Sequence, residues 1–415
     1  MERPLAIVLG GTLPHVTLVE RLHARGYRVA LVDYLADPPA KRAADEHVRL
    51  STLDREAVLD LARARGAALV ISACVDQANS VCCYVAEALG LPHPYSYETS
   101  LAVTEKGRMK AAFVANGIPT APYQEVSAVA EVDWGKVSYP AVVKPVDCNS
   151  SKGVRRVSDA AEASVRLGEA LAMSRAGKAI IEDFNDGDEI QVDCVAAADG
   201  VKVMMTRQKR KVSIEGDAFV LQSWGSVFPA PLSEELGARA TDVAERIAVA
   251  FGLRNTPFFY QATIVDGDIR VIEFAPRVGG GMSASILLES AGYDPVECVV
   301  QSYLGEEIRV TPVAQKAYRS TNILYMKPGV FDRIDGIEAL QREGVVTSCV
   351  LYKRRGDVLD GDLRSSNRVA SLTIDGETYD DLRRKSLRAL AEIEIRDPSG
   401  APMLNRSLYR SFCQT

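Results

Sequence analysis

The segment VIEFAPRVGGG places a glutamate and an arginine, Glu273 and Arg277, in an otherwise apolar stretch. Gln261 lies twelve residues before Glu273, across the turn-forming segment Asp266-Gly267. A hairpin that turns there would bring the Gln261 and Glu273 side chains together on adjacent strands. Such oxygen ligands suit Mg²⁺, which also prefers water and substrate phosphate oxygens. The spacing therefore predicts that Glu273 and Gln261 are metal ligands; a structural Glu–Arg ion pair beside a flexible turn is the alternative.

Arg277 and the glycines after it form a predicted substrate site. A guanidinium can hold a carboxylate or a phosphate with two parallel hydrogen bonds. Gly279, Gly280 and Gly281 allow the backbone to approach a ligand closely. We therefore expect Arg277 to be catalytic and the three glycines to line the substrate.

A lysine, Lys144, ends the apolar segment AVVKPV. An unpaired charge buried there would cost roughly several kcal/mol, and contact with a nucleotide phosphate would remove that cost. The loop 147–154 follows, in which Ser150, Ser151 and Lys152 add donors to backbone groups that can surround an anion. A lysine that reaches back to water and an ordinary polar turn are the alternatives.

The elements that must position these residues change in character along the chain. In the first hundred residues short apolar strands alternate with amphipathic helices, which predicts a parallel sheet. Asp33 and Asp76 follow two of these strands, at the edge where ligands bind such sheets. The Gly10-Gly11 turn lacks the G-x-G-x-x-G pattern, so a turn between strand and helix explains it better than a dinucleotide site.

Later segments predict a different architecture. A helix is expected over 104–117, where TEKGRMKAAFVANG is ended by glycine and proline. From about residue 139 strands and hairpin turns dominate, which predicts a mixed, mostly antiparallel sheet. Helices are expected over 160–174, 233–252 and 379–393.

Composition excludes several classes of protein. The 415 residues are 47% hydrophobic and 25% charged, which is typical of a folded protein. The net charge of -6 argues against nucleic acid as a partner, and no apolar run is long enough to span a membrane. The eight cysteines form no C-x-x-C pair and only four histidines are present, which disfavours a zinc site and favours reduced thiols in the cytoplasm.

The order of the motifs resembles the ATP-grasp superfamily of ligases. The matching features are the strand lysine, the small-residue loop, IIEDFNDGDE and E-x-x-P-R, with KGRMK before them. The resemblance covers nearly the whole chain. It implies an α/β and α+β fold with a Rossmann-like pre-ATP-grasp domain (1–100), two ATP-grasp lobes (101–190 and 191–305, the second with the metal site) and an accessory lobe (306–415).

The resemblance also implies roles for individual residues. ATP phosphates would be contacted by Lys106 and Lys144 and covered by the loop with Ser150, Ser151 and Gly153; Lys144 and Ser151 would act in catalysis together with Arg277. The remaining cofactor-binding residues would face adenine (Glu182, Asp183, Phe184 and Asn185) or hold the ribose hydroxyls (Glu189).

Two positions depart from the pattern of most relatives. Gln261 replaces a glutamate and Ala275 replaces an asparagine. A glutamine oxygen can still bind Mg²⁺, but one negative charge is lost, so one or two ions are both compatible with the sequence. E-x-A-P-R resembles the branch of carboxylating ligases that act on aminoimidazole ribonucleotide.

The implied activity is ATP-dependent joining of a small-molecule carboxylate to an amine through an acyl phosphate, with release of ADP and phosphate. The C-terminal unit and the RVGGG run resemble amino-acid and dipeptide ligases. Two alternatives stay open: a bicarbonate-activating ligase that forms carboxyphosphate, and a regulatory ATP-binding protein without turnover. The expected partners are small molecules, without nucleic acid or membrane. A homodimer is one of the oligomeric states that the sequence leaves open.

Overall fold

The computed structural model describes residues 3–148, 153–212, 222–280, 283–313, 315, 317–363 and 367–414. The chain forms two compact units. The first contains Met1–Gly187, Gln191–Met205 and Ser233–Val313, and the second Asp188–Ile190, Thr206–Leu232 and Ala314–Thr415. The division into four domains expected from the sequence stays a prediction.

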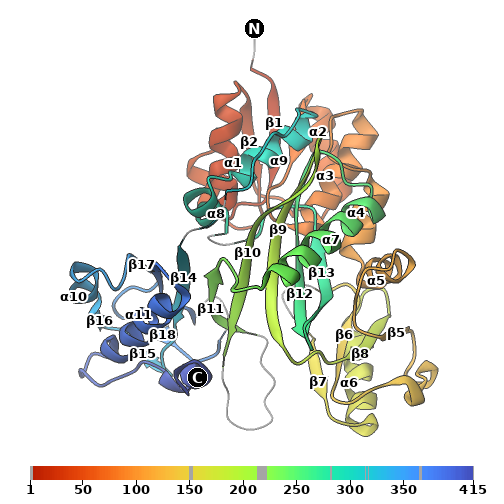
Figure 1. Ribbon diagram of the computed structural model, residues 1–415. Coiled ribbons are helices and arrows are strands. Elements are labelled where there is room, and N and C mark those ends of the chain that lie inside the picture. The colour runs from red at the N-terminus through yellow and green to blue at the C-terminus, as the bar shows by residue number, and fades with distance from the viewer. Residues whose placement is uncertain are drawn as a thin grey trace. The chain divides into compact units, whose positions relative to one another are not determined.

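The first unit begins with the expected parallel sheet, drawn in red and orange in Figure 1. The order is β3-β2-β1-β4, and all three pairings are parallel. Every residue of β1 is buried, which explains its uninterrupted apolar sequence. The elements are β1 (Leu5–Leu9), α1 (Leu13–Ala24), β2 (Arg28–Val32), β3 (Glu46–Val48), α2 (Arg55–Ala64), β4 (Leu69–Ile71) and α3 (Asp76–Leu89).

The helix expected over 104–117 is interrupted near its beginning. The structure has α4 (Tyr97–Thr104) and α5 (Lys106–Ala115), separated by Glu105 in an extended conformation (φ -96°, ψ 105°). The Lys106 N–H donates to Val146 O at 3.2 Å, beyond the end of a strand. This long-range hydrogen bond replaces a helical one and has no signal in the local sequence.

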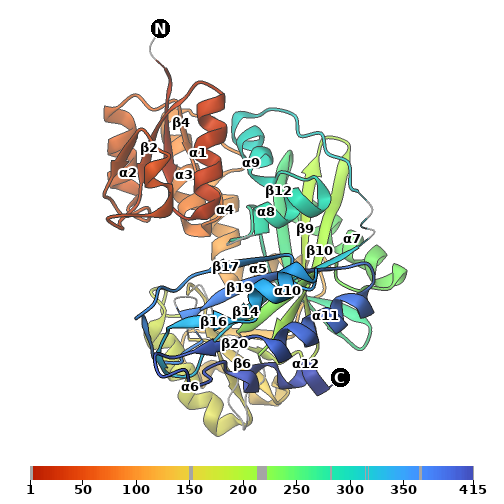
Figure 2. The same ribbon diagram turned by 90° about the vertical axis from the view of Figure 1, so that its left-hand side faces the viewer.

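An antiparallel four-stranded sheet follows, in the order β5-β8-β6-β7. Figure 2 shows its helix, α6, beside the strands. The apolar residues of α6 and the strands form one buried cluster. The elements are β5 (Tyr123–Val126), β6 (Ala141–Pro145), β7 (Arg155–Val157), α6 (Ala160–Met173) and β8 (Ala179–Asp183).

The last part of the first unit contains the strands that carry the predicted metal ligands. They lie in the order β13-β12-β9-β10, and β9 and β10 contribute residues to both units. The expected hairpin is confirmed, with Asp266 and Gly267 both at positive φ (52° and 75°). The elements are β9 (Asp188–Ala197), β10 (Gly200–Lys211), α7 (Glu234–Ala250), β12 (Thr256–Val265), β13 (Asp268–Ala275), α8 (Ser283–Ala291) and α9 (Pro295–Leu304).

The second unit is built on the antiparallel strand series β11-β14-β19-β17, to which β10 adds its last residues. Helix α11 packs on β14 and β19, as expected for 379–393. The elements are β11 (Ser223–Phe228), β14 (Tyr318–Leu324), β15 (Gly329–Val330), β16 (Arg333–Asp335), α10 (Ile337–Arg342), β17 (Ser348–Leu351), β18 (Val358–Leu359), β19 (Ala370–Gly376), α11 (Tyr379–Glu392), β20 (Glu394–Arg396) and α12 (Arg410–Gln414).

In the part of the chain that the structure describes, no helix combines the length and the apolar character that crossing a membrane requires.

Candidate active site

The predicted metal ligands face each other across the hairpin. From Val265 to Ala262 the register of β12 with β13 is regular, and a β-bulge then shifts it by one residue. Because of this shift Gln261 lies opposite Glu273, whereas an unbroken register would place it opposite Ile272. Directly opposed residues of antiparallel strands point to the same face of the sheet. The bulge therefore brings the two oxygen-bearing side chains together.

The chemistry of this pair fits Mg²⁺. It offers one carboxylate and one amide oxygen, and Mg²⁺ usually takes one or two protein ligands and fills its other positions with water and phosphate oxygens. Among the described residues, no group of three or more His, Cys, Asp or Glu gathers that could hold an ion by itself.

Two buried residues of β9 extend the polar face beyond Gln261, and sequence reasoning missed both. Gln191 and Asp193 have relative exposures of 1% and 4%. The Gln191 Nε2 donates to Asp193 Oδ1 at 2.9 Å, and Gln261 Nε2 donates to Gln191 Oε1 at 3.4 Å. The alternation of polar and apolar residues in EIQVDCV was the available signal, because it marks a strand with one polar face.

Lys106 is placed close to this region by the interruption between α4 and α5. Its ammonium donates to Cys148 O at 2.6 Å. Burial lowers the pKa of Lys106, and the nearby Glu273 carboxylate partly opposes this effect. The structure thus brings together a lysine and a glutamate that the sequence separates widely.

Lys144 shares a carboxylate with a second lysine. Its ammonium contacts Glu182 Oε1, and Lys110 Nζ lies 2.6 Å from Glu182 Oε2. Burial of Glu182 would raise its pKa, but Lys144 and Lys110 outweigh this effect, so the pKa is lowered and the carboxylate stays ionised. The charge of Lys144 is therefore balanced within the protein. Lys110 was not singled out from the sequence, although it ends the KGRMK motif.

The segment predicted to face adenine is held through its backbone and side chains. Asp183 N–H donates to Pro122 O and Phe184 N–H to Pro140 O, both at 3.0 Å. The Asn185 Oδ1 accepts a hydrogen bond from Arg270 Nη1 at 3.0 Å. These contacts fix the course of 183–185, while its role towards adenine stays a prediction.

Arg277 forms a two-point ion pair with Asp76. Its Nε and Nη2 donate to Asp76 Oδ1 and Oδ2, each at 2.6 Å, and its Nη1 donates to Val278 O at 2.9 Å. Burial alone would lower the pKa of Arg277, but the Asp76 carboxylate outweighs this effect. The pKa is therefore raised and the guanidinium remains charged. Asp76 is the carboxylate noted at the sheet edge, and the structure joins it to the predicted substrate arginine.

The glycine-rich segments are only partly described. Ser150, Ser151 and Gly281 lie outside the described residues. Gly153 has φ +75°, a conformation that favours glycine, and an added Cβ would lie 2.8 Å from Pro145. Gly279 is buried and Gly280 is exposed. The roles predicted for these glycines remain untested.

Glu189 belongs to the second unit. Its carboxylate forms an ion pair with Lys209, which belongs to a basic run, the segment RQKRK at 207–211. The next residue of that run, Arg210, is buried between the rings of Trp224 and Phe412, at 5.0 and 4.3 Å from their centroids. The basic run is thus partly occupied by contacts inside this unit.

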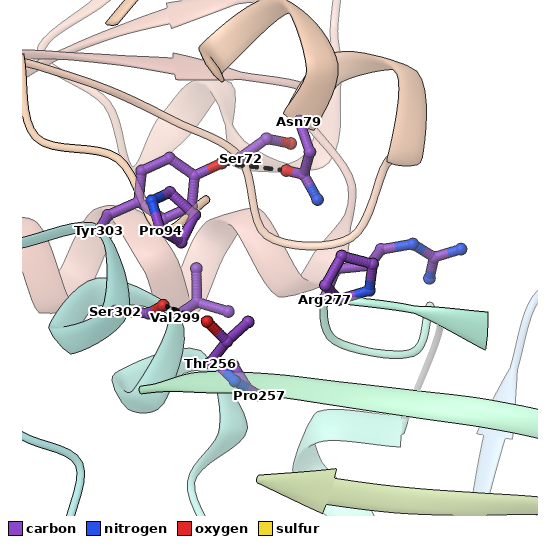
Figure 3. A pocket seen from close by; sticks show the side chains of 10 residues that line it. Ser72, Asn79, Pro94, Thr256, Pro257, Arg277, Val299, Ser302 and Tyr303 are labelled. Carbon is purple, nitrogen blue, oxygen red and sulfur yellow. Dashed lines mark hydrogen bonds between the residues drawn. The ribbon is translucent and has the colours of Figure 1, made fainter. Parts of the chain in front are cut away.

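A small pocket lies beside Arg277 (Figure 3). Of the predicted site residues it contains Arg277, whose side chain extends away from the other residues drawn. The Tyr303 hydroxyl donates to Asn79 Oδ1 at 3.3 Å, and Ser302 Oγ donates to Thr256 Oγ1 at 3.4 Å. The remaining lining residues are Ser72, Pro94, Pro257, Pro276 and Val299.

The turn after β1 is closed by its own side chains. Thr12 N–H donates to His15 Nδ1 at 3.2 Å, and Ser72 Oγ lies 3.2 Å from His15 Nε2 and 2.7 Å from Leu9 O. The Ala73 N–H also donates to His15 Nε2, at 3.4 Å, so both ring nitrogens take part in this network. Burial lowers the pKa of His15 to about 4. The Gly10-Gly11 turn therefore leads into a helix start that is capped internally.

Comparisons with known proteins find two family matches in this chain. Residues 137–285 match the ATP-grasp domain family, and residues 322–397 match the L-amino acid ligase C-terminal domain 2. The structure of an L-amino acid ligase from Bacillus licheniformis is similar, with a TM-score of 0.78 and 22% identity, over 96% of this chain and 100% of that one. The similarity to the L-amino acid ligase structure shows the fold.

Two curated relatives are also similar in sequence. The phosphoribosylamine–glycine ligase of Streptomyces coelicolor is 25% identical over 84% of this chain and 86% of its own length. The formate-dependent phosphoribosylglycinamide formyltransferase of Rhodococcus jostii is 27% identical over 62% of this chain and 64% of its own length, just under two thirds. Both names describe those proteins.

Proposed function

We propose that this member of the ATP-grasp superfamily, an ATP-dependent C–N ligase that forms ADP, joins the carboxylate of a small amino acid or peptide-like molecule to an amine. The observation that carries the proposal is the Gln261–Glu273 pair, with Lys106 electrostatically coupled to Glu273. The L-amino acid ligase domain over 322–397 supports an amino acid as substrate.

ATP with Mg²⁺ supplies the phosphoryl group that converts a carboxylate, a poor electrophile, into an acyl phosphate. Glu273 and Gln261 are proposed to hold one or two Mg²⁺ ions. Lys106 and Lys144 would bind the phosphates and stabilise the negative charge that spreads over a transferring phosphoryl group. The amine would then displace phosphate to form the amide.

Arg277 is proposed to bind the substrate carboxylate and its acyl phosphate. Asp76 takes two of its donor groups, so the guanidinium is held in one orientation before any substrate arrives. Such preorganisation is favourable because no reorientation is required during the reaction. The loop 147–154 and the glycines 279–281 would exclude water, which otherwise hydrolyses an acyl phosphate.

The experiment is ADP release with Mg²⁺ATP and either pooled amino acids or bicarbonate plus an amine. Stimulation by amino acids, with a new product mass, is expected. Stimulation by bicarbonate alone would refute amide formation and favour a carboxyphosphate-forming ligase. Tight ATP binding without stimulated release across a broad substrate panel would instead favour a regulatory protein.

Glu273→Gln tests the metal assignment. The variant keeps the size of the side chain but removes the charge, and we expect ADP release to fall about 100-fold or more. Asp268→Asn, in the same strand but exposed, is the matched control and should stay near the wild-type rate. A Glu273→Gln rate equal to that of the control would refute the role of Glu273.

A further inference from the structure

The amide of Gln261 has two chemically different ends, and a metal ligand must present the oxygen. A glutamate at this position would offer oxygen in either orientation, whereas a glutamine offers it in one. A glutamine at this position can therefore bind a metal only if a neighbouring group fixes the direction of its amide, which a glutamate would not require.

Two hydrogen bonds fix that direction, one within β9 and one from β12 to β9. A carboxylate accepts hydrogen bonds and does not donate them, so Asp193 requires the Nε2 end of Gln191. Gln191 Nε2 donates to Asp193 Oδ1 at 2.9 Å, which directs Gln191 Oε1 to the other side. That oxygen accepts from Gln261 Nε2 at 3.4 Å. The orientation of each amide follows from the one before it, starting at Asp193.

The strand order then decides where the Gln261 oxygen points. Strand β12, which carries Gln261, lies between β9 and β13. Its Nε2 is directed to Gln191 on β9, so its carbonyl oxygen is directed to the side of β13, where Glu273 is the opposed residue. Burial of Gln191 and Asp193 keeps water from offering alternative hydrogen bonds.

We propose that Asp193 and Gln191 are positioning residues that orient the Gln261 amide, so that its oxygen and the Glu273 carboxylate bind one Mg²⁺ together. The proposal rests on the metal site of the proposed function. Groups that orient a metal ligand typically change metal affinity about 10- to 100-fold when they are removed.

The test is the affinity for Mn²⁺ as a Mg²⁺ probe, measured by electron paramagnetic resonance in the presence of a nonhydrolysable ATP analogue. Gln191→Met keeps the length of the side chain and removes both the donor and the acceptor of the Gln191 amide. We expect it to weaken Mn²⁺ binding about 10-fold or more. Thr263→Val, a buried, nearly isosteric change in β12, is the matched control and should change the affinity less than about twofold.

The decisive comparison repeats Gln191→Met in the Gln261→Glu background. Both ends of a carboxylate are oxygens, so orientation no longer matters and Gln191→Met should change Mn²⁺ affinity less than about twofold there. An equal loss in both backgrounds would overturn the proposal, because it would indicate a general structural effect. Unchanged affinity in the Gln261 protein would overturn it as well.

A second pair of variants covers the case in which Gln191→Met does not fold. Asp193→Asn can donate as well as accept, so it no longer dictates the direction of the Gln191 amide and should weaken Mn²⁺ binding in the Gln261 protein, whereas in the Gln261→Glu background it should change the affinity less than about twofold. An equal effect of Asp193→Asn in the two backgrounds would overturn the proposal. Glu273→Gln distinguishes a failure of the proposed metal site from a failure of the orienting role of Gln191 and Asp193. If this variant binds Mn²⁺ like the wild type, the metal site of the proposed function is wrong. If it does not, a failure of the Gln191 variants refutes only the orienting role.

Discussion

The charged residues of the candidate site are balanced by partners that are distant in the sequence. Glu182 lies between Lys144 and Lys110, and Asp76 holds Arg277. A buried charge without a partner would cost roughly several kcal/mol. These pairs therefore explain how the lysines and the arginine of the site can be buried in the protein. The net charge of -6 does not reveal this arrangement, because it is a sum over the whole chain and the cations of the site are a few individual residues.

Asp76→Asn should lower kcat/KM about 10-fold, because it weakens two charge-assisted hydrogen bonds that orient Arg277. Steady-state ADP release measures the effect. Asp33→Asn is the matched control, since Asp33 follows β2 of the same parallel sheet and accepts from Leu35 N–H. Equal rates for the two variants would contradict a role for Asp76 in positioning Arg277.

His15 should make stability depend on pH. Its pKa is about 4 when folded and 6.5 in its ordinary state, so the unfolded chain binds a proton at higher pH than the folded one. The contribution of neutral His15 is complete above pH 6.5 and is lost as the pH falls towards 4, with about 1 kcal/mol lost between pH 7.5 and 5.5.

Urea unfolding of the wild type and of His15→Asn at these two pH values measures that contribution. The variant should be less stable at pH 7.5 but should lose about 1 kcal/mol less than the wild type on acidification. A His15→Asn protein with the wild-type pH dependence would show that His15 is not the titrating group.

At the scale of elements, two irregularities of the backbone position residues of the candidate site. The bulge in the β12–β13 hairpin sets Gln261 opposite Glu273, and the break at Glu105 positions Lys106 near Cys148. Bulges often re-aim a side chain next to an active site. Regular elements would have left these groups on other faces, so the irregularities are part of the function we propose.

The start of α9 offers a test of capping. Asp294 accepts hydrogen bonds from Val296 and Glu297 N–H at 3.1 and 3.0 Å, and its other oxygen pairs with Arg21 at 2.7 Å. Asp294→Ala should lower the free energy of unfolding by about 1–2 kcal/mol. Asp159→Ala, which removes only the cap of α6, should cost about 1 kcal/mol.

The excess of Asp294→Ala over Asp159→Ala should shrink in high salt, because Arg21 is partly exposed and its ion pair is screened. Thermal unfolding at two salt concentrations measures both effects. An excess that does not respond to salt would mean that the pair with Arg21 contributes nothing.

At the scale of the whole molecule, the residues proposed to bind phosphate and metal lie in the first of the two compact units, whereas Glu189 lies in the second. The L-amino acid ligase domain over 322–397 falls within the second unit. The effect of a bound ligand can therefore be followed in each unit separately.

ATP with Mg²⁺ should stabilise the first unit more than ATP alone. Binding at about 100 times Kd adds about 2.7 kcal/mol to the stability of the folded state. Hydrogen exchange measures this unit by unit, and protection should appear first in β12 and β13. In Glu273→Gln the increment due to Mg²⁺ should disappear while protection by ATP alone remains; an unchanged increment would place the metal elsewhere.

The sequence by itself determined the parallel N-terminal sheet, the hairpin at Asp266-Gly267 and most of the helices. These follow from periodicity and turn residues, which act over short distances. The order of the motifs also indicated a resemblance to the ATP-grasp superfamily, and residues 137–285 match the ATP-grasp domain family. Arg277 was identified by its type and spacing, without its partner.

Only the tertiary structure decided which residues meet. The Lys110–Glu182–Lys144 cluster, the Asp76–Arg277 pair and the row from Asp193 to Gln261 each join segments from different elements or strands. Such contacts depend on strand order, on a bulge and on a long-range backbone hydrogen bond. The energies that select them arise from burial and charge pairing in the folded chain, which no local pattern records.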